Sequence, residues 1–266
     1  MRPLPRTDFA KIILLLAFMS GCATSPLGRN QLLLAPEQQV ESMGVRSFAA
    51  MKQQKRMNTR PSDNRFVNCV ADALIRQTGG HWEVVVFDDP TANAFALPGG
   101  KIGVHSGILA ITRTQDQLAT VLGHELAHVL AHHANERLSQ QLAVRQGLSL
   151  VGAMAQPDSA SARLLMGALG MGAQYGILLP YSRTQESEAD LYGLELMAKA
   201  GFDPQASVAF WQNMDKNAGA QQPEFLSTHP SHENRIRELE RQIPAVMARY
   251  RPAKTAPSGP QCERGR

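Results

Sequence analysis

The sequence predicts a mainly helical α+β fold in which a small β-sheet lies beside a long helix. Short β-rich runs are confined to residues 82–105, and capping boxes at Thr114 and Ser182 each open a long helical segment. With 266 residues, 43% of them hydrophobic, the chain can bury a core of moderate size. We expect four parts in chain order, a leader, a tether, one domain and a flexible tail, at residues 1–21, 22–35, 36–250 and 251–266.

The first half of the domain is expected to hold two helices followed by a β region. Gly79 and Gly80 interrupt the helical pattern before a valine-rich run, which Asp88-Asp89-Pro90 ends. After a second β-rich run, Pro98-Gly99-Gly100 turns the chain so that a third run returns as a hairpin. The expected helices cover residues 36–57 and 61–77, and the expected strands cover 82–87, 93–97 and 101–105.

The first capping box consists of Thr114 and Gln117, and it opens a helix expected over residues 115–140 and beyond. Residues 142–180 are rich in Ala, Gly, Leu and Met, and they leave two interpretations open. They form either a helical hairpin that touches lipid or a set of close helix contacts inside a soluble fold. The second interpretation is favoured, because neither half offers the uninterrupted apolar span of about 20 residues that a bilayer requires.

The second capping box, Ser182 with Gln185, opens a helix that should end at Gly201, because glycine suits the left-handed position after a helix. Asp203-Pro204 should start the next helix, with proline in its first turn. A last helix is expected to be capped by Ser231 and to end near Tyr250.

The N-terminus has the pattern of a secretory signal. A basic start leads into an apolar run over residues 12–19, which is too short to span a bilayer, and then into Ser20-Gly21-Cys22. This ending resembles a bacterial lipobox, with Cys22 as the lipidated first residue, although Met19 stands where Leu is usual. The alternative is an ordinary signal peptide with a chance cysteine. Because Ala23 follows the cysteine, we expect anchoring at the periplasmic face of the outer membrane.

The charge balance argues against a nucleic-acid partner. The formal net charge is +4, and Arg2, Arg6 and Lys11 in the leader contribute to it, so the remaining chain is closer to neutral. A nucleic-acid-binding domain would carry a basic patch or stripe. We therefore expect no nucleic-acid partner.

Two further cysteines, Cys69 and Cys262, lie in the first half of the domain and in the tail. An oxidising periplasm would let them pair and so tie the tail to an early helix of the domain. The alternative is one buried thiol and one free thiol in the tail. The sequence leaves both interpretations open.

The segment His124-Glu125-Leu126-Ala127-His128 is an H-E-x-x-H motif inside a predicted amphipathic helix. A spacing of four residues puts both imidazoles on one helical face, where they can bind a single metal ion. Glu125 then lies beside the metal and can accept a proton from a bound water molecule. Apolar residues surround the motif at positions 118, 121, 122 and 126.

A catalytic zinc site needs a third protein ligand. His132 and His133 are interpreted as a polar helix flank, because one continuous helix cannot easily place three ligands around one ion. Glu186 is the better candidate, with Asp190 one turn later to accept the outer N–H of a ligand histidine. Glu188 points to another side of that helix and is the weaker candidate. The alternative is a solvated acidic stretch at a helix N-terminus.

Together these segments resemble peptidase family M48, the gluzincins of the HtpX and CAAX prenyl protease type. The resemblance covers about residues 35–245, and the membrane-spanning helices of its integral members are missing, so the chain is similar to the periplasmic lipoprotein branch. The matching segments are His124–His128, Ser182–Asp190, Asn93–Gly100, Gly201–Pro204, Phe210-Trp211 and Thr228–Ser231 with Arg235.

The resemblance implies a zincin-like metallopeptidase domain with one zinc ion bound by His124, His128 and Glu186 and with Glu125 as the general base. His229 is our candidate for the donor that stabilises the oxyanion of the transition state. A looser hypothesis has His229 swing onto the zinc ion and block the open position, which would make the enzyme latent. The alternative is a surface histidine in a loop.

The expected strand of Asn93, Ala94, Phe95, Ala96 and Leu97 has a second predicted role. An exposed edge strand beside the metal can pair with an extended substrate backbone, although a plain hairpin that closes the sheet is the alternative. The expected function is a zinc metalloendopeptidase that degrades or processes misfolded or unassembled envelope proteins. The rival function is a chaperone or assembly factor for outer-membrane proteins, and prenyl-protein processing is a weaker third.

Overall fold

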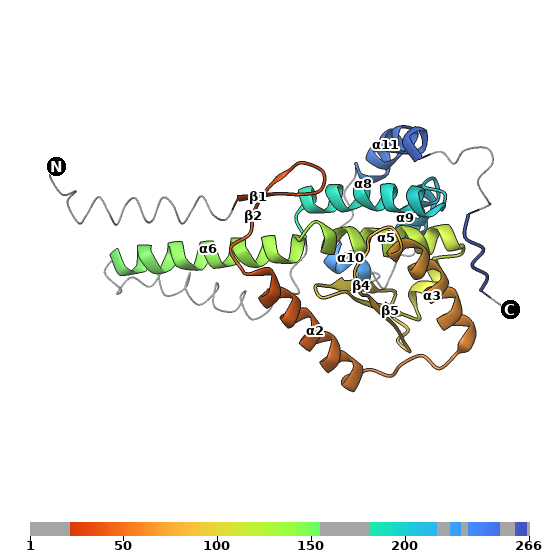
Figure 1. Cartoon of the computed structure of the whole chain (residues 1–266), viewed down its shortest axis with the longest axis horizontal. Coiled ribbons are helices and arrows are strands. Elements are labelled where there is room, and N and C mark those ends of the chain that lie inside the picture. Colours follow the sequence, from red (N-terminus) through yellow and green to blue (C-terminus); the bar gives the residue numbers. More distant parts are fainter. Residues whose placement is uncertain (1–21, 155–180, 217–223, 230–233, 251–258, 265–266) are drawn as a thin grey trace. The chain divides into compact units, whose positions relative to one another are not determined.

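The computed structural model describes residues 22–154, 181–216, 224–229, 234–250 and 259–264 (Figure 1). The leader over residues 1–21, the Ser231 cap and most of the segment 142–180 therefore lie outside the described residues. The described residues form two compact units. Of the described residues, the first unit contains 22–39 and 134–154, and the second contains 40–133 and those from 181 onward.

In the first unit, the expected tether contains a small β-hairpin. Strands β1 (Cys22–Thr24) and β2 (Asn30–Leu32) pair antiparallel. Both Nη atoms of Arg29 donate to the Glu136 carboxylate on α6 (His133–Met154), at 2.6 and 2.7 Å. The paired, mostly buried charges join the hairpin to this helix, which explains why the segment is ordered.

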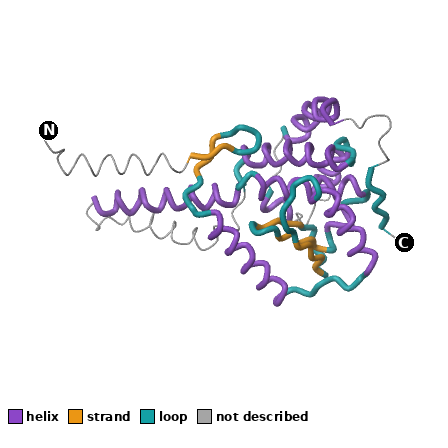
Figure 2. Tube along the Cα trace, viewed as in Figure 1, coloured by secondary structure: helices purple, strands orange, loops and turns teal. Residues whose placement is uncertain are grey.

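The second unit contains a three-stranded sheet, whose strands are drawn in orange in Figure 2. The strands lie in the order β3-β5-β4. Strand β3 (Glu83–Phe87) runs parallel to β5 (Lys101–His105), and β4 (Ala94–Leu97) pairs antiparallel with β5, as the predicted hairpin requires. Strand β4 is therefore an edge strand of this sheet. Helices α2 (Glu37–Gln54) and α3 (Pro61–Ile75) precede the sheet, close to their expected bounds.

Helix α5 (Gln115–Leu130) lies at the centre of the second unit (Figure 1). The Thr114 side chain caps it as predicted, but the helix is not amphipathic, because every residue from Gln117 to His128 is buried. A helix buried on all sides packs against several neighbours at once. Helix α5 contacts helices α3, α8 (Arg183–Ala200) and α9 (Ala206–Lys216) as well as strand β4.

The C-terminal helices agree with the sequence in kind and differ in detail. Helix α8 has the full capping box at Ser182, and Gly201 follows it with a φ of 85°, as predicted. Helix α9 begins two residues after Pro204, because residues 203–205 form a turn first. Helix α11 covers Arg235–Tyr250. Two short helices were not expected, α4 (Ile108–Ile111) and α10 (Glu224–Thr228).

The helix expected over residues 115–140 and beyond is broken. Helix α5 ends at Leu130 and α6 starts at His133, and His132 between them has a φ of 53°. Histidine is one of the few non-glycine residues enriched at positive φ, but no glycine or proline marks the break in the sequence. The expectation of one continuous helix was wrong for this reason.

A disulfide joins Cys69 of α3 to Cys262 in the C-terminal segment, with the two Cα atoms 5.7 Å apart. Arg264 continues the attachment: its Nε and Nη2 contact the buried Asp63 carboxylate, and its Nη1 donates to the Leu109 carbonyl at 2.7 Å. The segment 259–264 is thus fixed on the second unit by the Cys262 bridge that the sequence left open.

Among the described residues, no helix combines the length and apolar character needed to cross a bilayer.

Replacing both Cys69 and Cys262 with Ala should lower the free energy of unfolding by about 2–5 kcal/mol, because the bridge restrains a very long loop in the unfolded chain. Thermal unfolding with and without a reducing agent measures this effect. The reducing agent should lower the Tm of the wild type and leave that of the double variant unchanged. Equal Tm values for the two proteins would contradict the prediction.

Candidate metal centre

Helix α5 presents His124 and His128 one turn apart, as the spacing of the motif predicts. Their ring centroids are 4.6 Å apart and their Nε2 atoms are 3.0 Å apart. Both side chains are buried, and so is Glu125 beside them. Two imidazoles thus direct nitrogen atoms at a common point next to a buried carboxylate.

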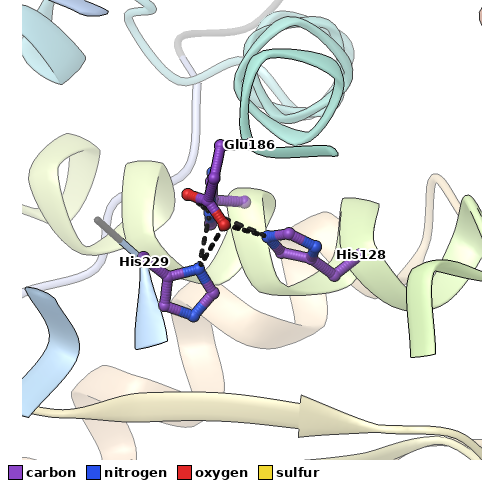
Figure 3. Close-up of side chains that lie close together, drawn as sticks. His128, Glu186 and His229 are labelled. Carbon is purple, nitrogen blue, oxygen red and sulfur yellow. Dashed lines mark hydrogen bonds and ion pairs between the residues drawn. The ribbon is translucent and has the colours of Figure 1, made fainter. Parts of the chain in front are cut away.

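Glu186 reaches this point from the first turn of α8. Its Oε2 lies 3.4 Å from His124 Nε2, and its Oε1 lies 3.4 Å from His128 Nε2. Figure 3 shows the carboxylate extending from α8 toward the imidazoles. The Ser182 cap starts α8 just before Glu186, so a local sequence signal helps to set the position of this carboxylate.

His229 also lies in the cluster, directly after α10. Its Nδ1 is 3.1 Å from Glu186 Oε1 (Figure 3). Its Nε2 is 3.1 Å from Glu125 Oε1. The ring stacks on Phe225, and the side chain is only 3% exposed. The alternative of a surface histidine is therefore wrong.

The ligand atoms of His124, His128, Glu186 and His229 all lie within 4.8 Å of one another. Asp190 Oδ1 lies 2.9 Å from His124 Nδ1, so this nitrogen donates to the carboxylate, and in the neutral imidazole the lone pair on Nε2 is left for the centre. His128 Nε2 lies 3.0 Å from this atom, so either a proton or a metal ion must lie between the two nitrogens. Nitrogen and carboxylate ligands of this kind suit zinc, so the residues fit such an ion.

A buried arginine lies beside the carboxylates of the cluster. Arg235 of α11 is 1% exposed, with its Nη2 2.7 Å from Asp190 Oδ1 and its Nη1 3.2 Å from Glu186 Oε2. The guanidinium group stacks on the Trp211 ring at 3.5 Å. A buried cation beside two carboxylates offsets part of their desolvation cost. The family resemblance includes Arg235 but gives it no role, and no local pattern links it to residues so far away in the sequence.

The pKa values of the cluster follow from burial and from these contacts. Burial lowers the pKa of His128 well below its ordinary value, and the contact with Glu186 only partly opposes this. Burial would raise the pKa of Glu186, but the charge of His229 and hydrogen bonds from three imidazoles hold it well below its usual range. A neutral imidazole beside an ionised carboxylate is the state in which these groups bind metals.

Burial lowers the pKa of His229, but the charges of Glu125 and Glu186 outweigh this effect and raise the pKa to about 9. For His124, hydrogen bonds to Asp190 and Glu186 likewise outweigh burial and raise its pKa. The carboxylates therefore attract a cationic group into the centre.

His133 and Glu188 lie beside the cluster rather than at a polar surface. His133 Nδ1 is 2.8 Å from His128 Nδ1, and its Nε2 is 3.1 Å from Glu188 Oε2. Both residues are buried. The interpretation of His133 as a polar helix flank was wrong, because it assumed that the helix continues through His132. Neither His133 nor Glu188 belongs to the group of four that could hold the metal.

The edge strand β4 meets this site at Glu125. The backbone N–H of Ala96 donates to Glu125 Oε2 at 3.1 Å. Ala94 and Ala96 are buried, Phe95 and Leu97 are half-buried, and Asn93 lies just before the strand with its carbonyl accepting from the His105 N–H at 3.0 Å. The strand and the candidate base are thus in direct contact.

Two glycines let α5 and α8 approach closely. A Cβ atom added to Gly193 would lie 3.0 Å from the backbone nitrogen of His124, and one added to Gly123 would lie 3.2 Å from the Gly193 carbonyl oxygen. Contacts this short against backbone atoms cannot relax without moving a helix. The separation that brings Glu186 to the two histidines therefore depends on these glycines.

A buried helix carrying H-E-x-x-H, with a glutamate supplied by a second helix, defines a metal-site protein of the gluzincin class. The model of "Peptidase family M48" matches residues 61–243, which is more than half of the chain. The chain therefore belongs to peptidase family M48.

Curated relatives agree with this assignment. The chain is 41% identical over 170 residues to "Mitochondrial metalloendopeptidase OMA1" of Schizosaccharomyces pombe, covering 63% of this chain and 48% of the relative. It is 33% identical over 255 residues to "Metalloendopeptidase OMA1, mitochondrial" of Homo sapiens, covering 89% and 48%. It is 35% identical over 170 residues to "Putative beta-barrel assembly-enhancing protease" of Vibrio cholerae, covering 59% and 34%. The chain spans about half the length of the mitochondrial relatives that it matches.

These relatives overturn the expected location. The sequence pattern suggested a bacterial lipoprotein at the periplasmic face of the outer membrane, but the relatives from fungi, animals and a plant are named as mitochondrial proteins. A lipobox-like ending depends on only a few small residues before a cysteine, so it is a weaker signal than similarity over most of the chain. The lipidation of Cys22 stays a prediction, and that residue begins β1.

Replacing Gly193 with Val should lower the Tm by an amount corresponding to about 1–3 kcal/mol, because the side chain forces α5 and α8 apart. The same displacement should weaken metal binding, which competition with a chromogenic chelator measures. Lys199→Val is the matched control, since it places the same side chain at an exposed position of α8. Full metal affinity in Gly193→Val would show that the separation of the two helices is not critical.

Proposed function

We propose that the chain is a zinc-dependent metalloendopeptidase. The observation that carries the proposal is the buried convergence of His124, His128 and Glu186 beside the carboxylate of Glu125. Membership of peptidase family M48 supports it, and so do the relatives named as metalloendopeptidases.

In this proposal, His124, His128 and Glu186 hold one zinc ion, and Asp190 fixes the tautomer of His124 through the 2.9 Å contact. A bound zinc ion would supply Lewis-acid activation of the scissile carbonyl and of the attacking water. Glu125 takes the proton from this water and passes it to the leaving amine nitrogen. The Ala96 N–H holds one oxygen of Glu125 and so orients the carboxylate.

The proposed substrates are proteins that present an extended, unpaired segment. Strand β4 is the edge of its sheet and contacts Glu125 through Ala96, so a peptide added along this edge would run past the catalytic carboxylate. Pairing through the backbone depends little on the identity of the side chains, so this mode of binding suits unfolded or unassembled proteins of varied sequence. The envelope substrates expected from the sequence depended on the location that the relatives contradict, so they form no part of this proposal.

A second candidate function is a chaperone or assembly factor that holds clients with little cleavage. The position of His229 favours this function. His229 Nε2 lies 3.1 Å from Glu125 Oε1, so the candidate base is already paired with an imidazole. The relative from Vibrio cholerae is named as an assembly-enhancing protease, which combines both kinds of activity in one name.

Cleavage of an unfolded model protein by the purified full chain tests the main proposal. Glu125→Gln should lower kcat by about 10²- to 10⁴-fold, because the amide cannot accept the proton. Its zinc content, measured by atomic absorption, should equal that of the wild type. A chelator should stop cleavage by the wild type, and added zinc should restore it. If neither protein cuts although both are full of zinc, the peptidase proposal fails and the chaperone function takes its place.

The role of His229 is tested by His229→Ala. We propose that His229 blocks the centre in the resting protein, since its Nδ1 lies 3.2 Å from His124 Nε2 and 3.1 Å from Glu186 Oε1. The variant should then cleave several-fold faster than the wild type at equal zinc content. A fall in turnover at equal zinc content would assign the oxyanion role instead, and an unchanged turnover would exclude both roles.

A further inference from the structure

A chain of three buried side chains leads away from the metal centre behind His128. His128 Nδ1 lies 2.8 Å from His133 Nδ1, and His133 Nε2 lies 3.1 Å from Glu188 Oε2. The exposed fractions of these residues are 1%, 0% and 7%. None of the roles proposed above uses His133 or Glu188.

We propose that His133 and Glu188 form a positioning relay that fixes the orientation and tautomer of the metal ligand His128. The inference rests on the proposed metal site, and it adds two residues that act on the metal through His128 without binding it. Glu188 belongs to the same helix as Glu186, so α8 supplies both a ligand and the end of the relay.

The order of protons along this chain follows from elementary chemistry. His128 can bind a metal through Nε2 only if its proton is on Nδ1. That N–H must then donate to His133 Nδ1, which has to present a lone pair. The proton of a neutral His133 therefore lies on Nε2, where the Glu188 carboxylate accepts it. With a metal on Nε2 of a neutral His128, every donor among these three side chains meets an acceptor in this arrangement.

The break between α5 and α6 makes the relay possible. In a continuous α-helix, a residue five positions later lies about 140° around the helix from the first. His133 would then face away from His128. The left-handed residue His132, with its φ of 53°, turns the chain so that His133 returns to the back of the His128 ring. A β-branched residue tolerates such a φ poorly.

The two ligand histidines are therefore held in different ways. His124 donates directly to the Asp190 carboxylate, which Arg235 also binds. The outer nitrogen of His128, Nδ1, is linked to the Glu188 carboxylate only through the imidazole of His133. Tyr181 stacks on the His128 ring, with the ring centroids 3.8 Å apart and the planes inclined by 21°. Stacking and the bond to His133 restrict both tilt and rotation of this imidazole.

The zinc affinity of the full chain, measured by competition with a chelator, tests the relay. His133→Phe keeps a ring but removes the acceptor, so it should weaken zinc binding by about 10- to 100-fold. His133→Gln should recover part of the loss, because its carbonyl oxygen can accept from His128 Nδ1. Glu188→Leu should also weaken binding. Glu195→Leu is the matched control, since Glu195 is a buried carboxylate of α8 that pairs with Arg249 away from the centre, and its zinc affinity should equal that of the wild type.

A measurement on the wild type covers the case in which a variant does not fold. Nitrogen-15 spectra of the imidazoles should show His128 protonated at Nδ1 and His133 neutral, protonated at Nε2. A His133 protonated at Nδ1 overturns the relay, and so does an unchanged zinc affinity in a folded His133→Phe. If the wild type binds no zinc at all, the proposed function fails together with the relay. Tight zinc binding by the wild type with unaffected variants contradicts the relay alone.

Discussion

The close packing of α5 against α8 is the constraint on which the metal centre depends. His124 and His128 come from one helix and Glu186 comes from the other, so the distance between the helix axes decides whether the three can converge. Gly123 and Gly193 set that distance, because neither places a side chain between the backbones. The cluster is thus a consequence of helix packing, with the ligand side chains completing an arrangement that the backbone already defines.

Burial of the cluster has an electrostatic cost that the surrounding charges offset. Glu125, Glu186 and Asp190 are all removed from water, and isolated carboxylates in such a place would take up protons. Arg235 and the imidazoles of His124, His128 and His229 supply hydrogen bonds and positive charge. The attraction between Glu186 and His229 contributes both to the lowered pKa of Glu186 and to the raised pKa of His229. The same carboxylates would stabilise a bound cation, because they already favour positive charge in the centre.

The sequence could predict those parts of the candidate site that depend on residues close together in the chain. The two imidazoles and Glu125 follow from helical spacing alone, and Glu186 with Asp190 follows from a second helix with a capping box. Other contacts could not be foreseen. No local sequence pattern predicts that Arg235, Tyr181 and Trp211 contact the site. The position of His133 was predicted wrongly because His132, a single residue at positive φ, changes the direction of the chain. The localisation signal at Cys22 was over-interpreted for a similar reason, since a short motif was given more weight than it carries.

The sequence by itself determined the starts of α5 and α8 and the end of α8, which residues alternate in the hairpin, and which side chains share a helical face. These properties depend on interactions between residues a few positions apart, so short patterns encode them. The tertiary structure alone decided that α5 is buried on all sides, that His229 lies inside the cluster, and that His133 contacts His128. Each of these depends on segments that are distant in the chain or on a backbone conformation that packing imposes. No local pattern contains that information.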